Sequence, residues 1–231
     1  NNYLYTFSKT KLGLCSSVNA ASKKSTKDFI IYAHDDMYFL PKWDLILKKE
    51  ISKLKNTLFY LSGTMMGPKE HIDFDCGDSY KNFDEAKLLN NYTNYNLYDH
   101  QGTHWAPHVI HKDLWNKIDG LDENFDPGFG SDPDLNMRLW NEGVRYFKGI
   151  NDCKVYHFGS ISLRKKKNLV TNNGARQFLK KWGMSIFFFK KYYLRSMQVF
   201  DAPLSDPNKK LFYYFELLIC KAKLIFLFFQ K

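Results

Sequence analysis

The fold class is decided by the stretch Asp28-Phe-Ile-Ile-Tyr-Ala33 and by the polar turn His34-Asp35-Asp36 that follows it directly. The apolar run has no polar break, which is typical of a strand buried on both faces of a parallel sheet. A proline at position 41 then opens a helix that is expected to reach about Leu54. The stretch therefore predicts a buried strand, a polar turn and a helix.

The same alternation continues along the chain. Further strands are expected at 3–7, 57–66, 104–111, 144–147 and 154–157, and further helices at 14–24, 112–118 and 132–142. Residues 67–100 are polar and rich in Asn, Asp and Tyr, and they are expected to form an irregular excursion over the surface. This alternation predicts an α/β fold with a mainly parallel sheet and flanking helices.

Charge is distributed unevenly. The net charge of the chain is +10, but residues 161–231 alone contain 15 Lys or Arg against 3 Asp or Glu. Such asymmetry indicates an anionic partner for the C-terminal part only, either nucleic acid or phospholipid. Nucleic acid is not expected as a partner, because the basic part has no recognition motif and its aromatic residues form an apolar run.

The cysteines Cys15, Cys76, Cys153 and Cys220 lie far apart and form no CxxC pair, which is typical of reduced thiols. Residues 1–20 lack the apolar core of a secretory signal. We therefore expect a cytoplasmic protein, which works at the inner face of the membrane if its C-terminal part binds lipid. The chain begins with Asn rather than Met, so a fragment of a longer reading frame is expected.

The C-terminal segment 191–231 is expected to be a basic, aromatic helical extension of a domain that spans 1–190. Residues 211–229 are apolar, but Glu216, Lys221 and Lys223 interrupt them. A membrane-spanning helix normally has about 20 apolar residues with few charges, so spanning is not expected. Two alternatives stay open: a helix that lies in the membrane interface, and a helix packed on the domain or on a second subunit.

The acidic pair Asp35-Asp36 lies at the carboxyl end of the expected strand, where open α/β sheets bind ligands. Adjacent like charges are costly to desolvate, and a bound cation explains the pair. Oxygen ligands suit Mg²⁺ or Mn²⁺, which would in turn hold the phosphates of a ligand. The alternative is a solvated turn in which one Asp caps the next helix. This segment alone leaves both readings open.

A second segment reads Gly120-Leu-Asp-Glu-Asn-Phe-Asp-Pro-Gly-Phe-Gly-Ser-Asp-Pro-Asp-Leu-Asn-Met-Arg-Leu139, followed by Gly143. It closely resembles a stretch of the family 2 glycosyltransferases, which have the GT-A fold. Residues 28–43 are similar to that family's strand with an Asp-x-Asp-type metal motif and a helix-opening Pro. Residues 155–160 resemble its strand-end His, and 174–183 resemble a Lys-Trp-Gly segment of bacterial members.

The resemblance implies a GT-A (nucleotide-diphospho-sugar transferase) Rossmann-like domain over 1–190. It implies inverting transfer of a sugar from a nucleotide-sugar donor to a glycan or glycolipid acceptor hydroxyl, as in cell-surface polysaccharide or glycolipid synthesis. By analogy with the fold, about 50 residues with the first strand and the base pocket would precede Tyr3, so the N-terminal strand is expected to be missing. A nucleotidyltransferase would share the metal chemistry, but the N-terminus lacks a Gly-rich, Lys-containing phosphate loop.

The resemblance implies Mn²⁺ or Mg²⁺ held by Asp36, with Asp35 or His34 assisting and His157 as a further ligand or a contact of the diphosphate. It implies donor contacts from His34, Asp35 and Asp36. Arg164, in the basic stretch 164–167, is expected to contact the diphosphate of the donor, and the alternative for this stretch is a solvated run of charges. His34 departs from the family pattern because it occupies the first position of the expected Asp-x-Asp.

The general base implied by the resemblance is Asp132, which would take the proton from the acceptor hydroxyl. The alternative is that Asp132 only caps the helix that begins there. Acceptor contacts are expected from Trp105 and Asp134, although Asp134 in the first helical turn also suits the helix dipole. Ser131 replaces the family's Glu, and a catalytically inactive GT-A protein that binds nucleotide or glycan is therefore the alternative function.

Overall fold

The computed structural model describes residues 4–10, 12–159 and 173–229. Its strands are β1 (Phe29–Tyr32), β2 (Met37–Phe39), β3 (Phe59–Gly67), β4 (Ile72–Asp73), β5 (His100–Gln101), β6 (His108–His111) and β7 (Tyr146–His157). Its α-helices are α1 (Leu14–Ser22), α2 (Trp43–Ile51), α3 (Glu85–Asn91), α4 (Lys112–Lys117), α5 (Ser131–Asn141), α7 (Gly174–Trp182), α8 (Ile186–Phe189) and α9 (Leu211–Phe229). Residues 4–10, where a strand was expected, have no regular structure.

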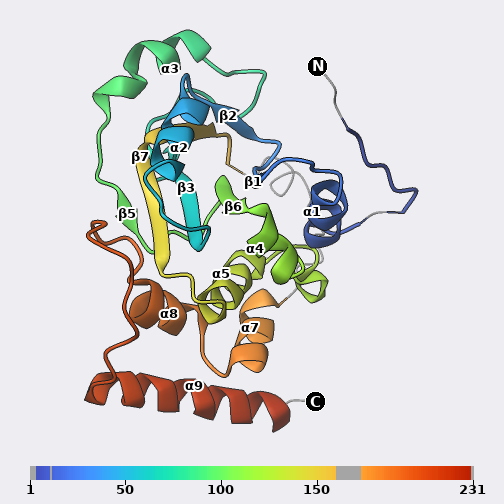
Figure 1. Ribbon diagram of the computed structural model, residues 1–231, viewed down its shortest axis with the longest axis vertical. Coiled ribbons are helices and arrows are strands. Elements are labelled where there is room, and N and C mark those ends of the chain that lie inside the picture. Colours follow the sequence, from blue (N-terminus) through green and yellow to red (C-terminus); the bar gives the residue numbers. More distant parts are fainter. Residues whose placement is uncertain (1–3, 11, 160–172, 230–231) are drawn as a thin grey trace.

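The described strands form a seven-stranded sheet with the order β1-β6-β3-β7-β2, and β4 and β5 pair with β3 and β7 (Figure 1). The α/β class is confirmed, but the sheet is mixed rather than mainly parallel. Only β3 with β7 and β3 with β4 run parallel, whereas the other four pairings are antiparallel. Apolar runs predict that strands exist, but the connections between strands determine their direction.

The strand β1 lies at one end of the sheet order, and its residues alternate between exposed and buried. Phe29 and Ile31 are 36% and 43% exposed, while Ile30 and Tyr32 are buried. The expectation of a strand buried on both faces is therefore wrong. A continuous apolar run does not distinguish an edge strand with one uncovered face from a central strand.

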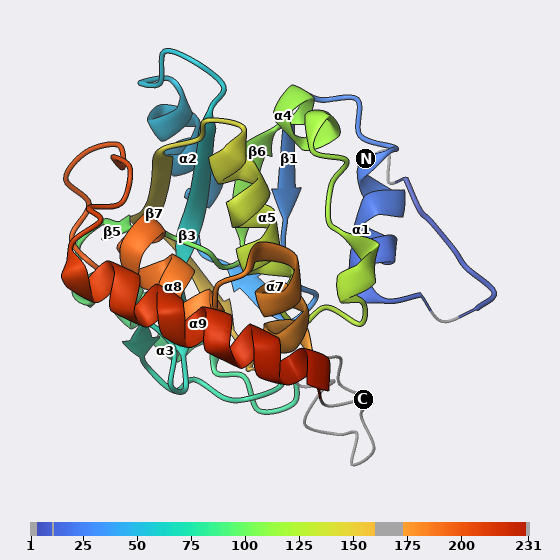
Figure 2. The same ribbon diagram turned by 90° about the horizontal axis from the view of Figure 1, so that it is seen from below.

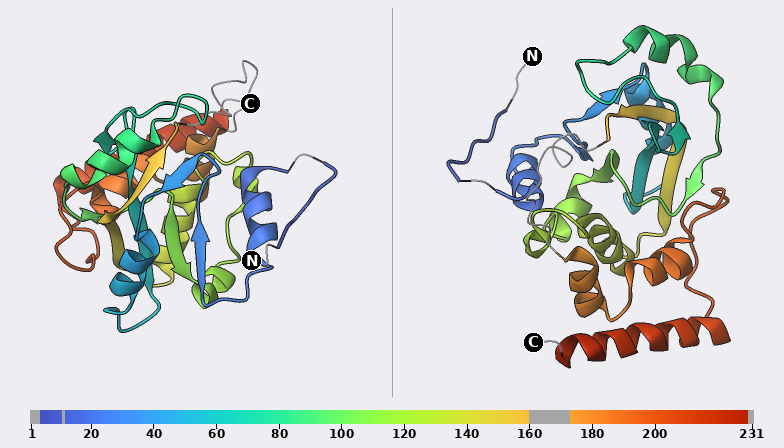
Figure 3. Two further views of the ribbon diagram at one scale, coloured as in Figure 1. Left: turned by 90° about the horizontal axis from the view of Figure 1, so that it is seen from above. Right: turned by 180° about the vertical axis from the view of Figure 1, so that it is seen from behind.

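Helices cover both faces of the central strands, as Figures 2 and 3 show. On one face Tyr60, Ile110 and Phe147 pack into the largest core cluster, which also contains buried residues of α5, α7 and α8. Their neighbours in sequence point to the opposite face, where Phe59 and Val109 pack with residues of α2. This period of two is the pattern that a pleated strand requires.

One long strand, β7, replaces the two short strands expected at 144–147 and 154–157. Its parallel register with β3 shifts between Gly63 and Thr64, where the partners change from Ile150 to Lys154. Such a bulge inserts extra residues into one strand without ending it. The polar excursion expected at 67–100 does leave the sheet, and it carries α3 and the short strands β4 and β5.

The segment after residue 190 packs on the body of the protein. Leu194, Leu204, Tyr213 and Cys220 belong to the same core cluster as α5. No helix in the described part of the chain is long and apolar enough to cross a membrane, in agreement with the expectation for 211–229. The four cysteines are unpaired and buried, as the sequence predicts.

Candidate functional site

The antiparallel pairing of β2 with β7 brings the acidic turn to the end of β7. Met37 is the register partner of His157, and the backbone N–H of Phe158 donates to the carbonyl of Asp36 at 3.0 Å. The turn after β1 therefore lies beside the last residue of β7. Two residues that are distant in sequence, Asp36 and His157, thus share one site.

The side chains of His34, Asp36 and His157 form a compact cluster. One potential ligand atom from each of the three lies within 4.8 Å of the others, which suits a single metal ion. Asp35 is exposed and is not part of this cluster. The expected metal ligands Asp36 and His157 do meet, and of the two residues expected to assist, His34 belongs to the cluster and Asp35 does not. The reason is geometric, because adjacent residues in a turn point in different directions.

Glu70, which follows β3, holds the imidazole of His157. The Nδ1 of His157 lies 2.6 Å from Oε1 of Glu70, and its Nε2 lies 3.4 Å from Oδ1 of Asp36. Burial alone would lower the pKa of His157, but the two carboxylates outweigh it and raise the pKa to about 9. If Nδ1 donates to Glu70, Nε2 faces the cluster, and this is the usual arrangement of a metal-ligating histidine and its carboxylate.

A row of rings leads from the cluster into the sheet. The ring centroids of His34 and His157 are 6.1 Å apart, and those of Tyr32 and His34 are 5.2 Å apart. Tyr32 pairs across the strands with His108, whose Nδ1 lies 2.9 Å from the hydroxyl of Tyr60. Burial lowers the pKa of His34, so its imidazole is neutral near pH 7 and able to bind a cation.

Asp132 is the second residue of α5, and it does not cap that helix. The N-cap is Gly130, and α5 has no side-chain cap. The Oδ1 of Asp132 is fully shielded and has no hydrogen-bond partner among the described residues. Burial raises the pKa of this carboxyl to about 7. The capping alternative is therefore wrong, and the environment is that of a carboxylate able to accept a proton near neutral pH.

Asp132 and the ring row lie close enough to interact electrostatically. The pKa of Tyr32 is raised, mainly by burial and then by the charge of Asp132, with smaller contributions from Asp36 and Asp35. The hydroxyl of Tyr32 and Nε2 of His108 are buried and, like Oδ1 of Asp132, have no partner among the described residues. Buried polar atoms normally have a partner, so these three are candidates for contacts with a ligand or with water.

Two glycines set the start of α5. Gly130 has a φ of 86°, a left-handed conformation that favours glycine over residues with a side chain. Gly174 at the start of α7 approaches so closely that a Cβ there would lie 1.9 Å from the carbonyl oxygen of Phe129. Ser131 is buried, and its Oγ donates to the carbonyl of Gly128 at 2.6 Å. This local packing fixes where Asp132 enters the site.

No model of a known protein family and no curated protein matches this chain. The interpretation of the site therefore rests on its residues and their geometry.

Asp134 belongs to a buried network rather than to a binding surface. It is 0% exposed, and its carboxylate lies 2.9 Å from Nε of Arg138, 2.8 Å from Nζ of Lys181 and 2.8 Å from Nε1 of Trp182. This environment gives Asp134 a structural role and argues against the expected contact with an acceptor, because all its surface is used inside the protein.

Trp105 is also buried, and its indole N–H donates to the carbonyl of Gly63 at 2.8 Å. Its ring packs against His71, with centroids 4.2 Å apart. The expected acceptor contact would therefore need a change in this packing. Arg164, expected to contact the donor, lies outside the described residues, so its expected role is not tested.

A pocket of about 670 Å³ lies next in sequence to the cluster, although no cluster residue lines it. Its wall includes Lys69 and Phe158, the neighbours in sequence of Glu70 and His157, and it also carries Asp75, Asp84 and Lys87. Cations and carboxylates of this kind suit phosphate groups and sugar hydroxyls respectively. This pocket therefore offers suitable polar groups for a ligand, next to two residues that flank the cluster residues in sequence.

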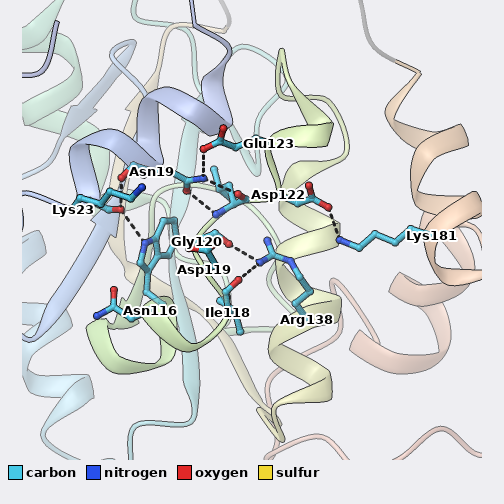
Figure 4. Close-up of a pocket in the computed structure, with 13 residues that line it drawn as sticks. Asn19, Lys23, Asn116, Ile118, Asp119, Gly120, Asp122, Glu123, Arg138 and Lys181 are labelled. Atoms are coloured by element: carbon cyan, nitrogen blue, oxygen red, sulfur yellow. Dashed lines mark hydrogen bonds and ion pairs between the residues drawn. The ribbon is translucent and has the colours of Figure 1, made fainter. Parts of the chain in front are cut away.

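A second pocket, of about 540 Å³, lies between α1, α4 and the loop before α5, and none of the cluster residues lines it (Figure 4). Its polar side chains are largely engaged with one another or with backbone. The side-chain amide of Asn19 donates to the carbonyl of Leu121 and accepts from its backbone N–H. Arg138 donates to the carbonyls of Ile118 and Gly120. These bonds anchor the loop that leads to α5, which is a structural role.

Sequence reasoning missed Glu70, Tyr32 and His108. Glu70 lies in the segment 67–100, which was expected to be irregular. The one local feature that could have drawn attention to it is its place between two residues able to carry a positive charge, Lys69 and His71. Tyr32 and His108 become neighbours only when β1 pairs with β6. No local pattern reveals a cross-strand pair of this kind, because the partners are far apart in the chain.

Proposed function

We propose that this protein transfers a sugar from a nucleotide-sugar donor to an acceptor hydroxyl with the help of a divalent cation. The observation that carries the proposal is the cluster of His34, Asp36 and His157, in which Glu70 orients the imidazole of His157. The separate, shielded carboxylate of Asp132 supplies the second chemical group that such a transfer needs. The resemblance of the sequence to family 2 glycosyltransferases with the GT-A fold supports the same reaction.

The donor set of the cluster fits a transition metal better than Mg²⁺. Two imidazoles and one carboxylate are softer ligands than the oxygen shell that Mg²⁺ prefers. We therefore narrow the expected cofactor from Mg²⁺ or Mn²⁺ to Mn²⁺, which accepts both nitrogen and oxygen ligands. Three protein ligands leave coordination positions for the diphosphate of a donor. A bound cation would neutralise the negative charge that develops on that diphosphate.

The proton of the acceptor is assigned to Asp132. The acceptor oxygen forms a bond with the anomeric carbon while its proton passes to the carboxylate of Asp132. The bond between that carbon and the diphosphate oxygen breaks, and its electron pair leaves with the diphosphate. A carboxyl whose pKa is about 7 is well matched to this task, since it is partly deprotonated at neutral pH and still basic.

The pocket beside Lys69 and Phe158 is the space that we assign to the substrates. A diphosphate bound at the cluster would reach the cations of this pocket, and the carboxylates of Asp75 and Asp84 suit hydroxyl groups of a sugar. Lys87 donates to the carbonyl of Asp75 at 2.8 Å, so the position of its charge is defined.

A second candidate function is binding of nucleotide or glycan without catalysis. It is favoured by Ser131 at the position of the family's Glu, because Ser131 is buried and has no acidic group. Both candidates need the metal cluster, but only transfer needs Asp132. The Asp132→Asn variant therefore separates them, because it removes transfer and leaves binding intact.

The test is calorimetric titration of UDP and GDP in the presence of Mn²⁺ or EDTA. We expect binding that requires Mn²⁺ and that is lost in Asp36→Ala and His34→Ala. Asp35→Ala is the matched control, since Asp35 is the exposed neighbour outside the cluster and its removal should change the affinity little. Equal losses in Asp35→Ala and Asp36→Ala, or metal-independent binding, would contradict the proposed site.

A further inference from the structure

The helix α9 is apolar on two opposite sides. Its inner side packs into the core through Tyr213 and Cys220, which are 4% and 5% exposed. Large apolar residues also cover its outer side, where they are exposed to solvent: Leu211, Phe212, Tyr214, Phe215, Leu218, Ile219, Ile225, Phe226 and Phe229. Packing against the body of the protein explains only the inner side, so the outer side needs a separate explanation.

The two lysines of α9 lie at the borders of this outer side. At about 100° per residue, Leu211, Phe215 and Leu218 fall near the midline of the outer side. Lys221 and Lys223 fall roughly a quarter turn away from that line, one on each side. Both lysines are exposed. An apolar strip bordered by lysines on both sides is the arrangement of a helix that lies in a membrane interface.

The position of α9 leaves the outer side accessible. The helix lies across one end of the molecule, outside α7 and α8 (Figures 1 and 2). Phe187 of α8 is 70% exposed, and together with Phe226 it lines a groove of about 760 Å³ beside α9. The apolar surface therefore extends from α9 onto the neighbouring helix. Lys209 and Lys210, both exposed, precede the helix and add positive charge at its start.

Charge favours a lipid surface over a second copy of the chain. If two copies of α9 paired by a two-fold axis, each would present Lys221 and Lys223 at the edges of the contact. The acid of the helix, Glu216, lies on the inner half and already pairs with Lys191. Because Glu216 is the one acid in 211–229 and is already paired, a second α9 offers these lysines no free acidic partner. An anionic lipid headgroup provides the missing negative charge.

We propose that the outer side of α9 docks the protein on an anionic lipid bilayer. In this arrangement α9 lies in the plane of the interface, its phenylalanines enter the boundary between headgroups and acyl chains, and Lys221 and Lys223 contact the headgroups. The proposal does not depend on the sugar-transfer activity, because it rests on α9 and α8 alone.

The test is co-sedimentation with vesicles of phosphatidylcholine alone and with vesicles that also contain about 40% phosphatidylglycerol, an anionic lipid that gives the vesicle a negative surface potential. We expect binding to the anionic vesicles and weak or no binding to the neutral ones. Lys221→Gln and Lys223→Gln should each lower the partition coefficient about fivefold at low salt. Phe215→Ser combined with Phe226→Ser should lower it by tenfold or more.

The matched control is Leu45→Ser on α2, since Leu45 is 59% exposed but belongs to another surface. It should bind vesicles like the wild type, and circular dichroism should show that all variants are folded. Equal binding of the α9 variants and the wild type would overturn the proposal. A second result would also overturn it. In that result, light scattering shows that the wild type is a dimer and that the Phe215→Ser, Phe226→Ser double variant is a monomer, and neither protein binds vesicles.

Discussion

Glu70 and His157 are joined by a contact of 2.6 Å between Oε1 and Nδ1, although one follows β3 and the other ends β7. The parallel pairing of β3 with β7 aligns Met66 with Tyr156, and this register brings the residues that follow both strands to the same edge of the sheet. The carboxylate thereby fixes the orientation of the imidazole that completes the cluster with His34 and Asp36.

If His157 binds Mn²⁺, Glu70→Gln should weaken Mn²⁺ binding about 10- to 100-fold. The amide is nearly isosteric, but it does not carry the negative charge that makes the imidazole a stronger ligand. Titration followed by the electron paramagnetic resonance of free Mn²⁺ measures this affinity.

Glu85→Gln serves as the control for that measurement, because Glu85 accepts a hydrogen bond from Tyr38 and lies outside the cluster. Its affinity for Mn²⁺ should match that of the wild type. If Glu70→Gln also matched the wild type, His157 would be a structural imidazolium between two carboxylates rather than a metal ligand.

Asp132→Asn should lower the rate of sugar transfer by about 10² to 10⁴-fold, which is the usual contribution of a general base. Binding of nucleotide and Mn²⁺ should stay unchanged, because Asp132 is not part of the metal cluster. In the wild type, kcat/KM for the proposed transfer should rise with pH, reach half its maximum near pH 7 and level off above about pH 8, since the base must be deprotonated and burial raises its pKa to about 7.

Glu142→Gln is a suitable control for the transfer rate, because Glu142 follows α5 and pairs with Lys117 at the surface. Its pH profile should keep the wild-type form. A flat pH profile for the wild type, or a rate for Asp132→Asn within a few fold of wild type, would assign the base to another residue.

Asp132 should also make stability depend on pH. Its pKa is raised from 3.8 to about 7 in the folded state, so the folded protein binds a proton that the unfolded chain has already lost between these values. The free energy of unfolding therefore falls as pH rises from about 4 to 7 and stays lowered above pH 7. Asp132→Asn removes this penalty and should be more stable than the wild type by about 4 kcal/mol at pH 8, with little gain at pH 4.

Urea denaturation at pH 4.5 and pH 8 measures this difference, with Asp152→Asn as the control, because the side chain of Asp152 is 73% exposed. Equal effects of Asp132→Asn at the two pH values would mean that the carboxyl is not protonated in the folded protein near pH 6.

Asp134→Ala should destabilise the protein by about 3 kcal/mol, because it leaves Arg138 and Lys181 without their shared buried partner. Asp206 pairs with Arg145 at the surface, and its side chain is 79% exposed. Asp206→Ala should therefore lower the free energy of unfolding by less than about 1 kcal/mol. Thermal denaturation of both variants gives the comparison. Similar losses would mean that the Asp134 network contributes no more than a surface ion pair.

Much of the local structure was predictable from residues that are close in the chain. Apolar spacing and the glycine at position 143 predicted α5, which ends beside that residue, and the apolar run 28–33 predicted β1. The shielding of Oδ1 of Asp132 was not predictable, and neither was which of His34 and Asp35 joins the cluster. Both depend on how side chains point after the strands have paired.

By itself, the sequence determined that the chain alternates strands and helices, that an acidic turn follows an apolar strand, and that its C-terminal helix is apolar with scattered lysines. These properties follow from local preferences and from the spacing of apolar residues. Only the tertiary structure decided the mixed strand directions, the meeting of Asp36 with His157 and Glu70, and the exposure of the outer side of α9. The reason is physical: strand pairing and packing join residues that are distant in the chain, and no local pattern specifies which ones will meet.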